Sequence, residues 1–171
     1  EALAAGIGAM GSAALYHLSR AGVDTVGIEQ FPVGHDRGSS HGHSRAFRTL
    51  YEHASYTRLA EASIPLWRTL ESDSGETLLN LNGMAIWARE GDARLQERLA
   101  VMDEVGSPYE LMTPSEISAR FPALRPPKGR VVCYIPRSGF VDAGKCVHAH
   151  VSEAKKRGTS VVDETPVRAI D

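Results

Sequence analysis

Cysteine is scarce in this chain of 171 residues, which contains only Cys133 and Cys146. Two cysteines cannot build the framework of several disulfides that holds small secreted domains together, and they fit a reducing compartment. A strong excess of either charge is also missing, because 19 Lys and Arg face 21 Asp and Glu for a net charge of −2. This balance gives no bulk electrostatic attraction to nucleic acid or to an anionic membrane, so neither is expected as a partner.

Long hydrophobic runs are absent as well. No stretch approaches the ~20 apolar residues of a membrane-spanning helix, and the first residues show no basic segment followed by an apolar one, as in a secretion signal. We therefore expect a cytoplasmic protein. The composition is that of an ordinary globular domain, with 42% hydrophobic and 23% charged residues.

A glycine-rich stretch near the start organises the rest of the sequence. Gly6, Gly8 and Gly11 are spaced as G-x-G-x-x-G, a helical pattern follows, and a β-rich run over residues 23–28 ends on Glu29. In such a unit the glycines permit a tight turn, a close approach of the backbone to a pyrophosphate, and close packing of the helix on the sheet.

This arrangement has the chemistry of a dinucleotide site. The start of a helix offers free N–H groups to phosphates, and an acid at the end of the next strand accepts hydrogen bonds from ribose hydroxyls. The strand expected before Gly6 is short and weakly β-forming. The alternative is an ordinary β-turn-α connection with Glu29 on the surface.

Residues 30–44 form a loop rich in glycine, serine and histidine. It is either a second cradle for an anion or ring system, or a loop exposed to solvent. His35, His41 and His43 have no acid or cysteine nearby at ligand spacing, so no metal site is predicted.

Arg45, Arg48 and Tyr51 come next, at three-residue spacing. If a helix begins here with Ser44 as its N-cap, the three side chains lie on one face. No acid stands one helical turn away from Arg45, so this face would suit an anionic ligand such as a substrate carboxylate. The alternative is a solvated basic edge.

Periodicity and capping residues predict the remaining elements. Helices are expected over residues 56–71, 92–105, 114–121 and 143–157. Strands are expected at 109–112, 131–135 and 160–162, at the start of a last strand over 167–171, and in a hairpin over 77–89 around Asn82-Gly83. The first of these helices should be kinked or start late at Pro65 and bury Leu59, Ser63, Leu66, Trp67 and Leu70.

The strand-helix-strand order near the end indicates that the chain returns to the α/β unit after an inserted β-rich section. The expected domain segments are 1–78 and 139–171 for the α/β domain and 79–138 for the insertion. A final strand with nothing after it leads us to expect the front part of a longer protein.

Three stretches resemble the monomeric sarcosine oxidase, N-methyltryptophan oxidase and pipecolate oxidase family of flavin amine oxidases, within the D-amino-acid-oxidase-like superfamily. They are GIGAMGSAALYHLSRAG from Gly6, GIEQF from Gly27 and GHDRGSSHGHSRAFRTLY from Gly34. The resemblance implies an α/β fold: a Rossmann-like FAD-binding domain with a parallel sheet, plus part of an inserted β-rich substrate domain. It also implies that the dinucleotide is FAD.

The resemblance assigns roles to individual residues. Arg45 would lie against the flavin ring beside His41, and Arg48 would bind the substrate carboxylate, so these three are the candidate catalytic residues. A larger set of residues would hold the parts of FAD, from the adenine, ribose and pyrophosphate to the ribityl chain and flavin ring. This cofactor-binding set consists of Gly6, Gly8, Ala9, Met10, Gly11, Glu29, Gln30, Gly38, Ser39, Ser40, His41, Arg45 and Val167.

The implied reaction oxidises the C–N bond of a secondary amino acid, N-methyl or cyclic, to an imine, while O2 is reduced to hydrogen peroxide. The expected partners are the small amine substrate and O2, and the expected state is a monomer. Three alternatives remain open. They are a nicotinamide-dependent dehydrogenase using the same glycines and Glu29, a flavin dehydrogenase with another acceptor, and a non-catalytic dinucleotide-binding module.

Overall fold

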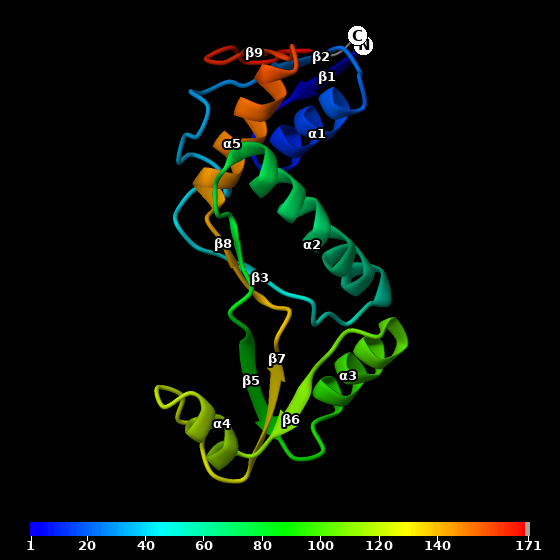
Figure 1. Ribbon diagram of the computed structural model, residues 1–171, viewed down its shortest axis with the longest axis vertical. Helices are drawn as coiled ribbons and strands as arrows, with labels where there is room; N and C mark the ends of the chain where they lie inside the picture. The colour runs from blue at the N-terminus through cyan, green and yellow to red at the C-terminus, as the bar shows by residue number, and fades with distance from the viewer. Residues whose placement is uncertain (170–171) are drawn as a thin grey trace. The chain divides into compact units, whose positions relative to one another are not determined.

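A computed structural model describes residues 1–169 of the chain, which divides into two compact units (Figure 1). The first unit consists of Glu1–Arg45, Trp67–Leu78 and the chain from Val141 onward, and the second of Ala46–Leu66 and Leu79–Phe140. The elements in chain order are β1 (Ala2–Ala5), α1 (Ala9–Arg20), β2 (Thr25–Ile28), β3 (Arg45–Phe47), α2 (Ala54–Ser74), β4 (Leu79–Asn80), β5 (Met84–Arg89), α3 (Ala93–Val105), β6 (Glu110–Met112), α4 (Pro114–Arg120), β7 (Arg130–Ile135), β8 (Gly139–Val141), α5 (Ala143–Lys156) and β9 (Ser160–Val162).

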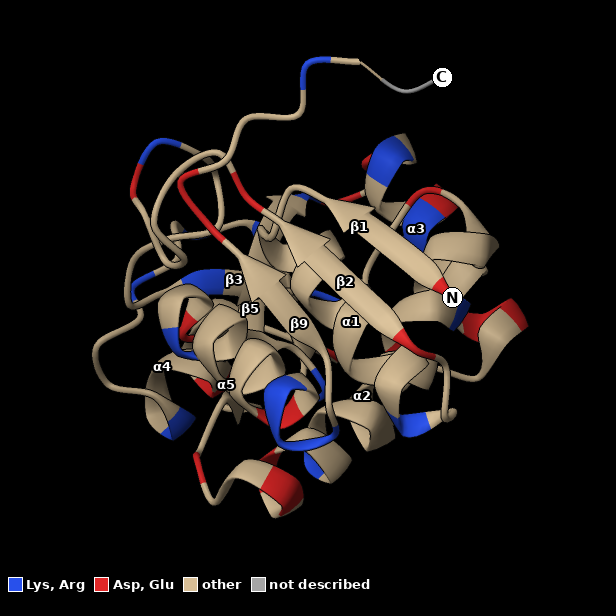
Figure 2. Cartoon of the chain, turned by 90° about the horizontal axis from the view of Figure 1, so that it is seen from above, with Lys and Arg blue, Asp and Glu red and all other residues tan. Residues whose placement is uncertain are grey.

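A parallel sheet of three strands in the order β1-β2-β9 forms the first unit (Figure 2). The weak strand before Gly6 is therefore present, and the predicted return of the chain to this sheet is confirmed by the pairing of β9 with β2. Parallel strands have their carboxyl ends along one edge, where ligands of open α/β sheets bind. The segments that follow β1, β2 and β9 therefore start at the same edge.

The helices α1 and α5 lie on the same face of this sheet, beneath it in the view of Figure 2. Ile7 and Leu15 pack with Val151 and Ala154 in the core between helices and sheet. Gly27, in the middle of β2, makes room for them, because a Cβ there would lie 2.6 Å from Leu15 Cδ1 and 2.7 Å from Ile7 Cδ1.

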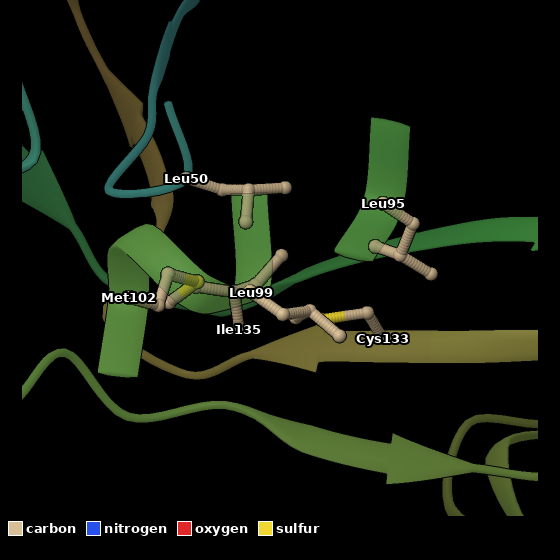
Figure 3. Packing of buried hydrophobic residues seen from close by; sticks show 6 residues of the cluster. All are labelled: Leu50, Leu95, Leu99, Met102, Cys133 and Ile135. Carbon is tan, nitrogen blue, oxygen red and sulfur yellow. The ribbon is translucent and has the colours of Figure 1, made fainter. Parts of the chain in front are cut away.

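The second unit is built on an antiparallel sheet in the order β5-β7-β6. The helix α3 covers one face through the cluster shown in Figure 3, which consists of Leu50, Leu95, Leu99, Met102, Cys133 and Ile135. On α4, Ile117 packs with Val132 and Tyr134 in a separate cluster. Because side chains alternate along a strand, β7 serves both clusters.

Local capping signals set the ends of several helices. Thr113 and Glu116 form the predicted capping box at the start of α4, with Pro114 as its first residue. Asp92 and Asp142 accept hydrogen bonds from backbone N–H groups and cap α3 and α5. These helices match their predicted ranges to within a residue or two.

The helix considered as one possibility after Ser44 does not form. Arg45–Phe47 is the strand β3, which belongs to a third sheet in the order β3-β8-β4, and the next helix starts only at Ala54. Arg45, Arg48 and Tyr51 therefore do not share a helix face. The preference for an extended chain comes from pairing with β8, which lies more than ninety residues away in sequence.

The predicted hairpin around Gly83 is also wrong. The strands on either side of it, β4 and β5, belong to different sheets. Gly83 has the positive φ expected of a turn, but its N–H donates to the Ser138 carbonyl (2.9 Å) and its α-carbon packs against the Tyr134 ring. The glycine carries the chain from one sheet to the next.

The helix α2 differs from its prediction in two respects. It runs from Ala54 to Ser74 through Pro65, so it does not start late. Proline removes one backbone hydrogen bond of the helix, but the hydrogen bonds of the turns before and after Pro65 are enough to continue it. Leu70 is buried as predicted, but Leu59 and Leu66 are 66% and 50% exposed. The strand predicted to start over residues 167–171 is not formed by residues 167–169. Residues 170 and 171 of that prediction lie outside the described residues.

No helix within residues 1–169 combines the length and the apolar character that crossing a bilayer requires.

A buried histidine lies between the helices of the first unit. His150, 6% exposed, packs at ring distances of 5.5 Å from Tyr16 and 5.6 Å from Trp67. Burial, reinforced by the charge of His17, lowers the pKa of His150 to about 4. Its ring is therefore neutral in the folded protein at neutral pH.

This histidine should make the protein sensitive to acid. Between pH 6.5 and about 4 the unfolded chain binds a proton at this position and the folded chain does not, so the stability present above pH 6.5 is lost as the pH falls. The effect is at most about 1.4 kcal/mol per pH unit. Urea titrations at a series of pH values give the free energy of unfolding. Between pH 6.5 and about 4 this free energy should fall less steeply in His150→Gln than in the parent protein. The exposed His53→Gln is the control, and equal slopes for His150→Gln and the parent would contradict the assignment.

Candidate functional site

The connection between β1 and α1 is a tight turn that depends on glycine at positions 6 and 11. Gly6 has φ of +88°, in the left-handed region that glycine enters without steric cost. A Cβ added at Gly11 would overlap the carbonyl oxygen of Gly6, and one added at Gly8 would lie 3.1 Å from Ser40 Oγ. The glycines thus bring the start of α1 and the loop over residues 30–44 close to the end of β1.

The start of α1 presents backbone N–H groups at this turn. Gly8 is the N-cap and has no side chain that could accept a capping hydrogen bond, while the Ala9 N–H donates to Ser40 Oγ at 2.9 Å. The N–H groups of Met10 and Gly11 belong to the first turn, where the helix itself supplies no acceptor. Together with the positive end of the helix dipole they form a site for an anion such as a phosphate.

Glu29 lies directly beside the glycine turn. It is only 5% exposed, and its carboxylate accepts hydrogen bonds from the Ile7 N–H (2.6 Å) and the Phe31 N–H (3.2 Å). The acid at the end of β2 is therefore not a surface residue. It holds a charge close to the point where the anion site begins.

The loop over residues 30–44 contains no helix or strand, as predicted, but it is folded back onto the glycine turn. A cavity of about 40 Å³ separates the two and is lined by Ile7, Gly8, Gly34, His35, Gly38, Ser40 and Val147. Ser40 reaches the first turn of α1, and His35 Nε2 lies 3.5 Å from Glu29 Oε1.

Sequence reasoning did not include His35 in the candidate site. The histidine was considered only as a metal ligand, and its position six residues after Glu29 in a glycine-rich loop was the available signal. In the structure its ring faces Glu29, and it lines the same cavity as Gly8 and Ser40.

The other predicted residues lie in four places. Gly38, Ser39 and His41 are exposed on the loop, and the Arg45 guanidinium donates to the Ser39 carbonyl at 2.8 Å. Gln30 is exposed next to Glu29.

Val167 and Arg48 lie outside this cluster. Val167 is 44% exposed in the segment after β9, two residues beyond Thr165, whose N–H donates to the Glu29 carbonyl at 2.8 Å. Arg48 belongs to the second unit, where its guanidinium carbon lies 5.5 Å from the centre of the Tyr51 ring.

Metal and thiol chemistry find little support in the part of the chain that the structure describes. Across residues 1–169, no three His, Cys, Asp or Glu side chains gather at ligand distances. Burial raises the pKa of Cys133 to about 11 and that of Cys146 to about 12, so both remain neutral thiols of low reactivity.

A parallel β-α-β unit with a glycine turn, free N–H groups at the start of its helix and an acid at the end of its second strand defines a dinucleotide-binding fold. Residues 5–171 match the family model described as FAD dependent oxidoreductase, the DAO family. The chain belongs to this family.

Several characterised relatives are similar in sequence. Monomeric sarcosine oxidase of Streptomyces avermitilis is 33% identical over 98% of this chain and 44% of its own length. Human peroxisomal sarcosine oxidase is 29% identical over the whole of this chain and 44% of its own length. N-methyl-L-tryptophan oxidase of Yersinia pestis is 27% identical over 97% of this chain and 45% of its own length. The chain thus spans a little under half the length of these relatives.

Solved structures share the fold. L-proline dehydrogenase of P. horikoshii superposes with a TM-score of 0.84 at 20% identity, over 97% of this chain and 44% of that one. Glycine oxidase of Geobacillus kaustophilus superposes with a TM-score of 0.78 at 22% identity, over 96% of this chain and 46% of that one.

The family's cofactor is FAD, and the residues of the glycine turn fit such a group. A side chain at Gly8 would crowd Ser40 beside the turn, and the first-turn N–H groups match phosphate oxygens. A nicotinamide dinucleotide is not favoured, because the family match extends over almost the whole chain and not only over the β-α-β unit.

The glycine at position 11 should be required for both folding and cofactor affinity. In Gly11→Ala the new methyl group collides with the Gly6 carbonyl, so α1 must move away from the turn. We expect a loss of about 1–3 kcal/mol in stability, as in other overpacked sites, and weaker FAD binding.

Gly144→Ala is the matched control for this variant. A Cβ at Gly144, in α5, meets nothing closer than 3.7 Å, so the change should be neutral or slightly stabilising. Thermal melts and FAD titrations of both variants measure the difference. Equal behaviour of the two variants would show that the close approach does not matter.

Proposed function

We propose that the protein is an FAD-dependent oxidase of secondary amino acids, N-methyl or cyclic, of the sarcosine oxidase kind. The amine substrate loses two hydrogens to become an imine, and O2 gains them to become hydrogen peroxide. The observation that carries the proposal is the glycine turn with Glu29 and Ser40 beside it, in a chain that belongs to a family of FAD-dependent oxidoreductases. The similarity to sarcosine oxidases supports the substrate class.

Within this proposal the first unit is the FAD-binding domain. The turn from Gly6 to Gly11, including Ala9 and Met10, holds the pyrophosphate through its N–H groups, and Glu29 accepts from the adenosine ribose, next to Gln30. The loop residues Gly38, Ser39, Ser40 and His41 face the ribityl chain and flavin ring, and the Val167 backbone faces the adenine. The bonds from Ala9 to Ser40 and from Arg45 to Ser39 support a loop with a defined shape.

The second unit is proposed to be part of the substrate domain. Bound FAD supplies an acceptor for the hydride equivalent from the carbon next to nitrogen. Arg48 binds the substrate carboxylate and thereby fixes the orientation of that carbon, while Arg45 and His41 lie beside the flavin ring. The exposed guanidinium of Arg48, stacked on Tyr51, supports its availability for an anion.

We further infer a monomeric cytoplasmic enzyme whose partners are its amine substrate and O2. The name of the Streptomyces relative supports a monomer, and the two free thiols fit a reducing compartment. The human relative is named peroxisomal, which makes the peroxisome the alternative compartment. Light scattering and cell fractionation test both assignments.

Purified full-length protein should be yellow and should consume O2 when sarcosine or a cyclic imino acid is added. One hydrogen peroxide is expected per O2 consumed, measured with an oxygen electrode and a peroxide assay. Flavin bands without O2 consumption, but with reduction of an artificial dye, would replace the oxidase by a dehydrogenase. A colourless protein that binds a nicotinamide dinucleotide and not FAD would refute the proposal.

Removal of the Arg48 guanidinium should weaken substrate binding without releasing FAD. A charge-assisted pair contributes about 1.5–3 kcal/mol, so Arg48→Ala should raise the KM for a carboxylated amine about 10- to 100-fold. For the same amine without its carboxyl group, the two proteins should differ little. Arg125→Ala, an exposed arginine of the same unit, is the control. An unchanged KM for the carboxylated amine would exclude the role given to Arg48.

A further inference from the structure

His35 has a polar neighbour at each ring nitrogen. Its Nδ1 accepts a hydrogen bond from the Arg37 N–H at 3.0 Å, and its Nε2 lies 3.5 Å from Glu29 Oε1. Because a neutral imidazole with an accepting Nδ1 carries its proton on Nε2, the hydrogen bond from Arg37 assigns the tautomer. The polar Nε2–H therefore lies on the side of the Glu29 carboxylate.

The ring has little freedom to turn away. It contacts the Phe31 ring edge-on, with the ring centres 4.9 Å apart, and the Arg37 guanidinium lies over the same Phe31 ring, 4.6 Å from its centre. Gly38 lies close to another edge of the ring, since a Cβ there would be 3.6 Å from His35 Cε1. The side chain is 20% exposed, unlike that of His43 on the same loop, which is fully exposed.

Glu29 needs such a partner. Its buried carboxylate has two backbone donors, Ile7 N–H on one oxygen and Phe31 N–H on the other. A buried carboxylate that lacks donors is costly, and the cost is relieved by movement of the side chain toward water. A polar hydrogen from His35 opposes such movement, because it faces the oxygen that has the longer hydrogen bond.

We propose that His35 is a positioning residue for FAD and acts by holding the Glu29 carboxylate oriented at the glycine turn. This inference rests on the proposed function, in which Glu29 accepts hydrogen bonds from the adenosine ribose. His35 touches neither the ribose nor the reacting atoms in this role. It fixes the acceptor that does bind the ribose, and so it contributes to affinity for the cofactor and not to the chemical step.

Two substitutions separate positioning from packing. His35→Gln keeps a donor of similar reach and loses the ring, whereas His35→Leu keeps apolar bulk and loses the donor. Apoprotein of the full-length chain, prepared from riboflavin-starved cells, is titrated with FAD, and the quenching of flavin fluorescence reports the non-covalent binding step. We expect a Kd about tenfold higher in His35→Leu and within about threefold of the parent in His35→Gln.

The route through Glu29 is tested by a double-mutant cycle. Glu29→Gln retains an acceptor for the Ile7 N–H but has no charge for His35 to stabilise. In that background His35→Leu should cause no further loss of FAD affinity, whereas independent effects would add. His43→Ala serves as the control, and melting temperatures of the apoproteins show whether a variant has lost its fold.

The outcomes distinguish this inference from the function beneath it. Equal Kd values for His35→Leu and the parent, similar losses in the Leu and Gln variants, or additive losses in the cycle would each overturn the positioning role and leave the flavoenzyme intact. Failure of the parent protein to bind FAD would overturn the proposed function, and the role of His35 with it.

Discussion

The helix α1 can start where it does only because Gly11 has no side chain. Its α-carbon lies so close to the Gly6 carbonyl that a Cβ would overlap the oxygen, and Gly6 itself needs a left-handed backbone. If either condition failed, the first turn of α1 would move away from the end of β1. The free N–H groups of that turn, the contact of Ala9 with Ser40 and the packing of Leu15 beneath Gly27 all depend on this one close approach.

Glu29 links this turn to the rest of the candidate site. One oxygen accepts from Ile7, at the turn, and the other from Phe31, at the start of the loop that carries His35 and Ser40. A carboxylate in this position pairs buried backbone donors and keeps acceptor capacity at the carboxyl edge of the sheet, where the proposed ribose contact would use it. The backbone of Glu29 also accepts from Thr165, which ties the segment after β9 to the same edge.

Features that depend on neighbouring residues could be predicted from the sequence. The glycine turn, the capping box of Thr113 and Glu116, and the cap at Asp142 are all encoded within a few positions. The errors concern residues whose conformation is decided far away in sequence. Arg45 is in a strand because β8 pairs with it, and Gly83 connects two sheets because Ser138 and Tyr134 meet it there. Likewise, helical periodicity gives α2 an apolar stripe but does not indicate which part of it other residues cover.

The same distinction explains what could be read of the candidate site. The spacing of the glycines and the acid at the end of β2 predicts a dinucleotide, but it suits FAD and a nicotinamide dinucleotide equally well. What the spacing does not contain is the fold of the following loop, in which Ser40 reaches Ala9 and His35 reaches Glu29. A simple nicotinamide-binding unit does not require such a loop. The contacts between the loop and the glycine turn, together with the family match, therefore favour a flavin site, and they are the reason why we propose a role for His35 in it.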